Sequence, residues 1–215
     1  MNLKSLLDEL QKELREREKV KEEVQKIMRK AAHLSKRAIV LIHQKRMKES
    51  RDLLEEAKSL FRRLREICVQ HPDMFYTGIV NAAFQEYAEA NILMGLIENE
   101  RFVSPTEIDV PAVDYISGLA DVIGELRRQA LDALRNGNLI YAEKCLQTME
   151  TIYLELIAMN EGFLLVSGLR RKCDVARRII EATRGELTVE ARRSSLEKAI
   201  RKLEERFEKQ GKVEG

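Results

Sequence analysis

The sequence predicts an all-α fold, and three observations carry that prediction. The only three prolines, Pro72, Pro105 and Pro111, lie between segments of helical pattern, where proline can begin a helix without breaking one. In the long proline-free stretches, apolar residues recur at alternating steps of three and four. No Gly-, Pro- or Ser-rich linker divides the chain, so we expect a single domain over residues 1–215 that includes a charged C-terminal helical extension from about residue 186.

The first half of the chain predicts three long helices. The apolar positions of the first helix are spaced as in an amphipathic helix with a narrow seam; they are Leu3, Leu7, Leu10, Leu14, Val20, Val24, Ile27, Ala31 and Leu34. A second helix is expected at about 48–69. The third follows Pro72 and is apolar all round, which predicts that it is buried. Residues 98–110 read as a connection with one short helical turn.

The second half predicts four further helical segments. One covers about 113–135 and ends at Asn136-Gly137-Asn138, a sequence typical of a helix C-terminus. Another covers about 139–160, and residues 161–168 are either loop or helix. A helix of about 169–183 is expected to end at Gly185, before a last helix at about 189–209. That last helix carries a narrow apolar stripe, which suits packing on a neighbouring helix or subunit; its members are Leu196, Ile200, Leu203 and Phe207.

Composition limits the function classes. Hydrophobic residues make up 44% of the 215 residues and charged residues 34%, with a net charge of only +2, so a nucleic-acid partner would have to bind a localised basic surface. The three cysteines show no C-x-x-C spacing and indicate a reduced, intracellular protein. The first residues lack the apolar core of a signal peptide, and no uncharged apolar run reaches the roughly 18 residues of a membrane span. We therefore expect a cytoplasmic protein without a membrane partner.

Two pairs of carboxylates stand out from their surroundings. Glu86 and Glu89 are spaced i, i+3, and Asp121 and Glu125 are spaced i, i+4, in two segments that are otherwise almost uncharged. Residues three or four apart share a helix face, so each pair converges on one place. Buried carboxylates repel one another and lose hydration. Either Arg and Lys from other helices form salt bridges with them, or a divalent cation binds them; the spacing alone leaves both readings open.

The ligand types narrow the choice of metal. Neither acidic segment contains a histidine, and an all-oxygen ligand set favours Mg²⁺ or Mn²⁺ over zinc or copper. Magnesium held by a few carboxylates usually acts on phosphate, where it activates a water and stabilises the leaving oxygen. The pattern therefore predicts a nuclease centre. Gly-rich phosphate loops, G-x-S-x-G and H-E-x-x-H are absent from the sequence.

Several basic positions are candidates for nucleic-acid binding. Arg127 and Arg128 follow Glu125 directly, so they could meet a phosphate drawn to the metal. The alternative is that such runs are solvated helix faces. Base stacking has little support, because the chain has no tryptophan and few other aromatic residues. The candidates are Lys36, Arg37, Arg127, Arg128, Arg170, Arg171 and Lys172.

The motifs around these residues resemble the translin and translin-associated factor X family. The similarity lies in S-K-R-A-I at 35–39, Q-E-Y-A-E-A at 85–90, D-Y-I-S-G-L-A-D-V-I-G-E-L at 114–126, G-N at 137–138 and L-R-R-K-C-D at 169–174. The resemblance implies an all-α fold of about seven helices, a closed, octamer-like hollow homo-oligomer, and binding of RNA or single-stranded DNA inside it.

The same resemblance implies a catalytic role. The translin-associated factor X branch is the Mg²⁺-dependent endoribonuclease, and its acidic positions correspond to Glu86, Glu89, Asp121 and Glu125, all occupied here. The rivals are a non-catalytic RNA or single-stranded DNA binding protein of the translin type and a helical scaffold for proteins. The chain departs from translin at residues 73–80, where translin is rich in Arg and His, and in the extension after Gly185.

Overall fold

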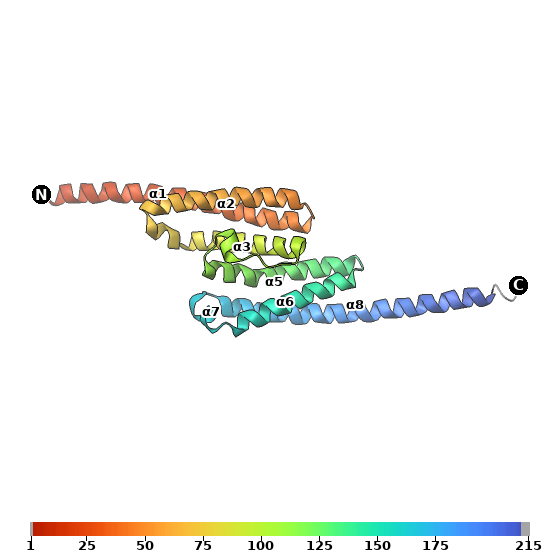
Figure 1. Cartoon of the computed structure of the whole chain (residues 1–215). Coiled ribbons are helices and arrows are strands. Elements are labelled where there is room, and N and C mark those ends of the chain that lie inside the picture. The colour runs from red at the N-terminus through yellow and green to blue at the C-terminus, as the bar shows by residue number, and fades with distance from the viewer. Residues whose placement is uncertain (1, 212–215) are drawn as a thin grey trace. The chain divides into compact units, whose positions relative to one another are not determined.

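The computed structural model describes residues 2–211, and the side chains of residues 2–206. This part of the chain is helical and has no strand, which confirms the all-α prediction (Figure 1). It contains eight α-helices rather than about seven, because two are short, and one 3-10 helix. The elements are α1 Leu3–His43, α2 Met47–Gln70, η1 Pro72–Tyr76, α3 Gly78–Asn99, α4 Pro105–Ile108, α5 Ala112–Arg135, α6 Leu139–Ala158, α7 Asn160–Leu165 and α8 Leu169–Gly211.

The residues cluster into two compact units. The first comprises Met1–Val122 with Leu164–Ser167, and the second Ile123–Phe163 with Gly168–Gly215. The division falls within α5, whose first turns belong to the first unit. The expectation of one domain remains a prediction. Among the described residues, no helix is both long and apolar enough to cross a membrane.

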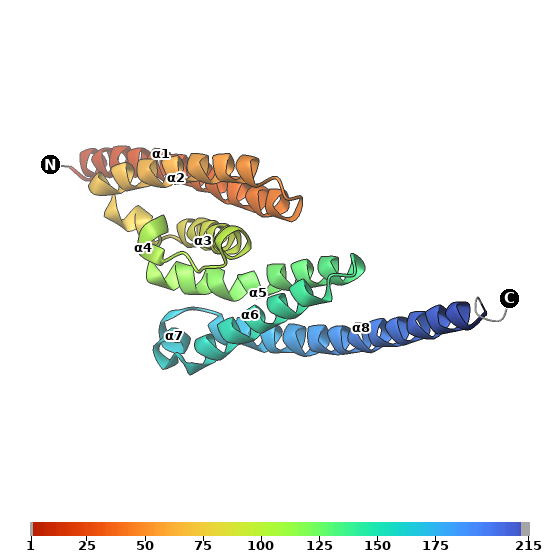
Figure 2. The same ribbon diagram turned by 45° about the vertical axis from the view of Figure 1, so that its right-hand side comes forward.

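An antiparallel pair formed by α1 and α2 is the framework of the first unit, and both views show the two helices side by side (Figure 2). Small residues let them approach closely: Ala31, Ala38 and Ala57 have no exposed surface. The buried Ser50 of α2 donates its hydroxyl hydrogen to the backbone oxygen of Ala38 at 3.0 Å. The expected seam is buried only in the second half of α1, since Leu3, Leu7, Leu10 and Leu14 are 46–70% exposed.

The apolar helix α3 packs against this pair and is buried as predicted. Its Phe84 stacks on Phe61 of α2 with ring centroids 4.3 Å apart, and Tyr87 lies 5.0 Å from the same ring. Burial raises the pKa of Tyr87 to about 12. Offset aromatic pairs of this kind stabilise a core beyond their buried area. This cluster fixes α3, and with it the two glutamates, against α2.

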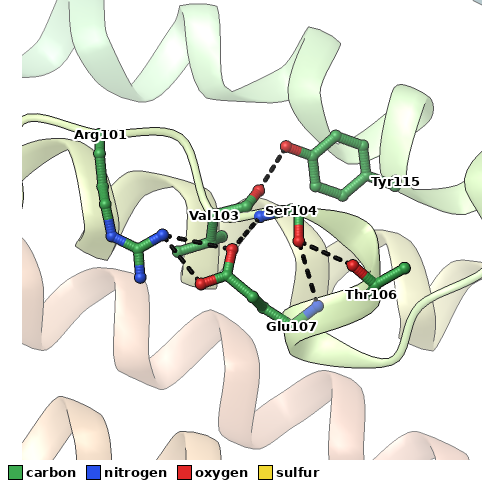
Figure 3. A network of polar contacts seen from close by, with 6 residues as sticks. All are labelled: Arg101, Val103, Ser104, Thr106, Glu107 and Tyr115. Atoms are coloured by element: carbon green, nitrogen blue, oxygen red, sulfur yellow. Dashed lines mark hydrogen bonds and ion pairs between the residues drawn. The ribbon is translucent and has the colours of Figure 1, made fainter.

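The predicted short turn between α3 and α5 is present as α4. Ser104 accepts a hydrogen bond from the backbone of Glu107 at 3.2 Å, and the Glu107 carboxylate accepts one from the Ser104 backbone at 2.6 Å (Figure 3). This capping box satisfies two helix-end donors. Tyr115, on the first turns of α5, donates to the backbone oxygen of Val103 at 2.6 Å. The connection therefore sets where α5 begins.

The second unit is built on α6 and α8, which lie side by side in both views. The expected break at Gly185 is wrong, because α8 continues through it from Leu169 to Gly211. A helical glycine costs only about 1 kcal/mol relative to alanine. Contacts on both sides outweigh that cost: Arg127 of α5 hydrogen-bonds Thr183 at 2.6 Å and forms an ion pair with Glu186 at 2.9 Å.

At Gly118, α5 packs closely on the backbone of α3. A Cβ at this position would lie 2.7 Å from the backbone oxygen of Gln85 and 2.9 Å from the backbone nitrogen of Glu89. Two backbones approach this closely only where a side chain is absent. Gly118 therefore sets the spacing of the two acidic helices.

We predict that Gly118→Ala lowers the free energy of unfolding by about 1–3 kcal/mol, because the methyl group has no room beside the α3 backbone. Gly124→Ala is the matched control on the same helix, since a Cβ there meets nothing within 4 Å. The control should be stabilising by about 0.5–1 kcal/mol, because alanine favours the helix. Urea unfolding of both variants measures the difference, and equal effects would contradict the packing argument.

Candidate functional site

The glutamates of α3 occupy different environments. Glu89 is buried, with 8% of its surface exposed, whereas the side chain of Glu86 is 22% exposed. Lys36 of α1 lies beside Glu86, with its Nζ 3.1 Å from Oε1. Lys36, a predicted nucleic-acid-binding residue, thus forms an ion pair with Glu86, a predicted metal ligand. Because the Lys36 side chain is 64% exposed, its ammonium group also faces solvent.

Asp121 is held by a relay of hydrogen bonds between α3 and α5. Ser117 donates its hydroxyl hydrogen to Oε1 of Gln85 at 2.9 Å, and Gln85 donates from Nε2 to Oδ2 of Asp121 at 2.5 Å. Because a carboxylate oxygen accepts hydrogen bonds, the Nε2 end of the Gln85 amide faces Asp121 and its Oε1 end faces Ser117. Gln85 is a site residue that the charge pattern missed, although it directly precedes Glu86 and lies one turn before Glu89.

A second amide and carboxylate pair extends this polar face toward the start of both helices. Asn81 of α3 donates from Nδ2 to Oδ1 of Asp114 at 3.0 Å. Asp114 is only 4% exposed, and its Oδ2 has no hydrogen-bond partner among the described residues. Burial raises the pKa of Asp114, and the bond from Asn81 opposes that shift. The sequence analysis did not identify this buried carboxyl.

Glu125 follows Asp121 by one turn on the continuous helix α5 and belongs to the second unit. The structure therefore places Glu86, Glu89 and Asp121 on two helices that meet at Gly118. In the part of the chain that the structure describes, no group of three or more His, Cys, Asp or Glu side chains is arranged to hold a metal ion. The donor types suit Mg²⁺, because all are carboxylate oxygens, and the four-ligand cluster remains a prediction.

The predicted basic residues divide into exposed and structural side chains. Arg37, Arg128, Arg170 and Arg171 are exposed, and Lys172 is half-buried. Arg170 also lies over the ring of Phe163, with its guanidinium carbon 5.4 Å from the ring centroid. Arg127 differs, because its guanidinium binds Thr183 and Glu186 and lies 3.3 Å from the backbone oxygen of Ile179. Its contacts are those of a residue that joins α5 to α8.

Comparison with known proteins identifies the family. The model of the Translin family matches residues 19–183, which include both acidic helices. The chain belongs to the Translin family. This confirms the family indicated by the D-Y-I-S-G-L-A-D-V-I-G-E-L segment. The match ends just before Gly185, so the rest of α8 lies beyond the family model.

Individual similar proteins extend the comparison. The chain is 31% identical over 193 residues to the uncharacterized protein MJ0175 of Methanocaldococcus jannaschii, which covers 89% of this chain and 85% of that protein. Among solved structures it resembles apo-NeC3PO, with a TM-score of 0.77 and 29% identity. It also resembles AfC3PO in a complex with duplex RNA, with a TM-score of 0.75 and 34% identity. Both structural matches cover 86% of this chain and 96% of the other.

We predict that Asp114→Asn makes the protein progressively more stable, relative to the wild type, as the pH rises above about 4. The raised pKa means that the folded state binds the Asp114 proton more tightly than the unfolded state does. The wild type therefore loses stability between the unfolded and the folded pKa, at about 1.4 kcal/mol per unit of difference. The amide introduced by the substitution does not titrate, so the variant does not lose stability in this way. Its oxygen can still accept the hydrogen bond from Asn81.

Urea unfolding at a series of pH values from 4 to 8 measures the stability difference between variant and wild type. Asp8→Asn, at an exposed position on α1, is the control and should give a difference that stays nearly constant. A constant difference for Asp114→Asn as well would show that Asp114 is charged in the folded protein throughout this range.

Proposed function

We propose that this Translin-family protein is a Mg²⁺-dependent endoribonuclease that cleaves RNA phosphodiester bonds inside a hollow homo-oligomer. The observation that most supports the proposal is the carboxylate-bearing face where α3 meets α5. Glu89 is buried there, and Asp121 accepts a hydrogen bond from the amide of Gln85. A divalent cation held by these carboxylates would offset the cost of bringing them together in a partly buried place.

In this proposal Glu86, Glu89, Asp121 and Glu125 hold the metal. Bound Mg²⁺ or Mn²⁺ would supply an activated water and stabilise the leaving oxygen of the scissile phosphate. Gln85 donates to Oδ2 of Asp121 from one end of its amide and accepts from Ser117 at the other end, so the two bonds together hold the amide between α3 and α5. Lys36 presents an ammonium group beside Glu86, where it neutralises charge before a phosphate arrives and can contact that phosphate afterwards.

The choice of RNA as the substrate rests on the family and on the exposed basic side chains. One structural relative is described as a complex with duplex RNA. In this chain Arg128 lies on the same helix as Asp121 and Glu125, and its exposed guanidinium can meet a phosphate backbone. The oligomer remains an expectation from the resemblance.

A second candidate function is binding of RNA or single-stranded DNA without catalysis. The ion pair of Lys36 with Glu86 favours it, because a glutamate that only neutralises a lysine needs no metal. The hydrogen bond from Gln85 to Asp121 suits this reading as well. Both functions predict nucleic-acid binding, so cleavage and its metal dependence separate them.

We predict that Glu125→Ala lowers the rate of RNA cleavage about 100-fold or more, because it removes a proposed metal ligand. RNA binding should change little, since the basic residues stay in place. The measurement is cleavage of labelled RNA with Mg²⁺ and then with EDTA, beside a gel-shift assay of binding. Asp132→Asn is the control on the same helix, because Asp132 forms an i, i+3 ion pair with the exposed Arg135. Unchanged cleavage in Glu125→Ala would refute the catalytic assignment.

We predict that the neighbouring arginines of α5 affect different properties, Arg128 RNA binding and Arg127 stability. Arg128→Ala should weaken RNA binding and reduce the salt dependence of log K by about 1, because it removes one phosphate contact. Arg127→Ala should lower the free energy of unfolding by about 1–3 kcal/mol, because Thr183 and Glu186 lose their partner. Binding titrations at several salt concentrations and urea unfolding of both variants test this division. This division would be contradicted if Arg127→Ala weakened RNA binding as much as Arg128→Ala does and left the free energy of unfolding unchanged.

A further inference from the structure

Helix α8 changes its apolar face at Leu187. Up to that residue, the buried positions recur at steps of four and three; they are Leu169, Cys173, Ala176, Ile180, Thr183 and Leu187. Beyond it, the large apolar residues up to residue 206 are Val189, Leu196, Ile200 and Leu203. At 100° per residue, this second stripe lies roughly 180° around the helix from the first. The second stripe is therefore not a continuation of the packing inside the second unit.

Solvent reaches this second stripe. Val189 is 67% exposed, Leu196 62%, Ile200 46% and Leu203 52%. A groove of about 820 Å³ borders its first residue, with Leu131 and Leu134 of α5 among its lining. In both views the end of α8 extends beyond α6 (Figures 1 and 2). The stripe also lies outside the family match, which ends at residue 183.

The spacing of the stripe is that of a coiled-coil seam. Val189, Leu196 and Leu203 repeat every seven residues and take the d positions of a heptad, and Ile200 takes an a position. Arg193 occupies the preceding a position and forms an ion pair with Glu197 at 3.2 Å. A polar residue at a single a position is a known means of specifying register. The stripe thus has both the period and the composition of a helix that pairs with another helix.

The charges beside the seam indicate which helix pairs with it. The e positions are all glutamates, and the g positions include two arginines; they are Glu190, Glu197 and Glu204 at e, and Arg192 and Arg206 at g. Two parallel copies bring g of one helix to e of the other, so Arg192 meets Glu197 of the second copy. Antiparallel copies bring e to e and g to g, which places like charges together. The segment is complementary to itself only in the parallel arrangement.

We propose that residues 189–206 of α8 form a parallel, two-stranded coiled coil with the same segment of a second copy of this chain. The seam buries the four exposed apolar residues, and the e and g residues select the orientation. This contact is independent of the nuclease assignment, because it involves none of the acidic residues on α3 and α5. The exposed leucines of α1, from Leu3 to Leu14, are the competing partner that the experiment must exclude.

Disulfide trapping in the full-length protein tests the pairing. In a Cys68→Ser background, Leu196→Cys places a thiol at a d position, where two parallel copies in register bring identical residues together. The other two native cysteines are buried. We expect Leu196→Cys to form a covalent dimer at least about 10-fold faster than Lys198→Cys, its control at an outward-facing f position. Equal rates would overturn the proposal. So would a mixed sample in which Leu196→Cys cross-links to Leu10→Cys but not to a second copy of Leu196→Cys.

Charge reversal tests the parallel orientation. One variant carries Glu197→Lys and the other carries Arg192→Glu, the e and g positions that face each other in the parallel pair, each with Leu196→Cys. Alone, each should cross-link roughly 10-fold more slowly than the unreversed protein, because like charges face each other. Mixed, the two should recover the fast rate as a heterodimer. The pair Lys198→Glu with Glu205→Lys, at f positions, should have no effect. Failure of the mixture to recover, with helix content unchanged by circular dichroism, would overturn the parallel arrangement.

Discussion

The close approach of α3 and α5 at Gly118 is the constraint on which the candidate site depends. A Cβ there would meet the backbone oxygen of Gln85 at 2.7 Å, so the helices can lie this close only because the side chain is absent. At this spacing an α3 amide reaches an α5 carboxylate directly, as Gln85 does to Asp121 and Asn81 to Asp114. A wider spacing would admit water between them and remove the orientation of Asp121.

The choice of amides as partners has an electrostatic consequence. An amide donor satisfies one carboxylate oxygen but cancels no charge, whereas a lysine or arginine does both. Lys36 brings a cation to this face through its ion pair with Glu86. Burial raises the pKa of Asp114, which favours its protonated acid. In the proposed activity, a divalent cation would join Glu89 and Asp121 and lower the cost of placing two carboxylates close together.

Features that depend on local sequence pattern were predictable, whereas features that depend on contacts with residues far along the chain were not. The apolar character of α3 predicted its burial, and the pattern of residues 98–110 predicted the turn α4. Gln85 and Asn81 were missed because a neutral amide leaves no mark in a charge pattern. Arg127 was taken for a surface cation, although Thr183 and Glu186, over fifty residues later, bind it. The same contacts carry α8 through Gly185, which local propensity alone predicted to be a break.

The length of the exposed seam on α8 limits what it can do alone. Residues 189–206 hold fewer than three heptads, and helices this short associate weakly when isolated in water. Pairing becomes favourable when other contacts already hold two copies together, since the local concentration of the second helix is then high. The extension would therefore add specificity to an assembly formed by the rest of the chain rather than create one. Its position beyond the family match fits such a role, because a contact added at the end of a helix leaves the site on α3 and α5 unchanged.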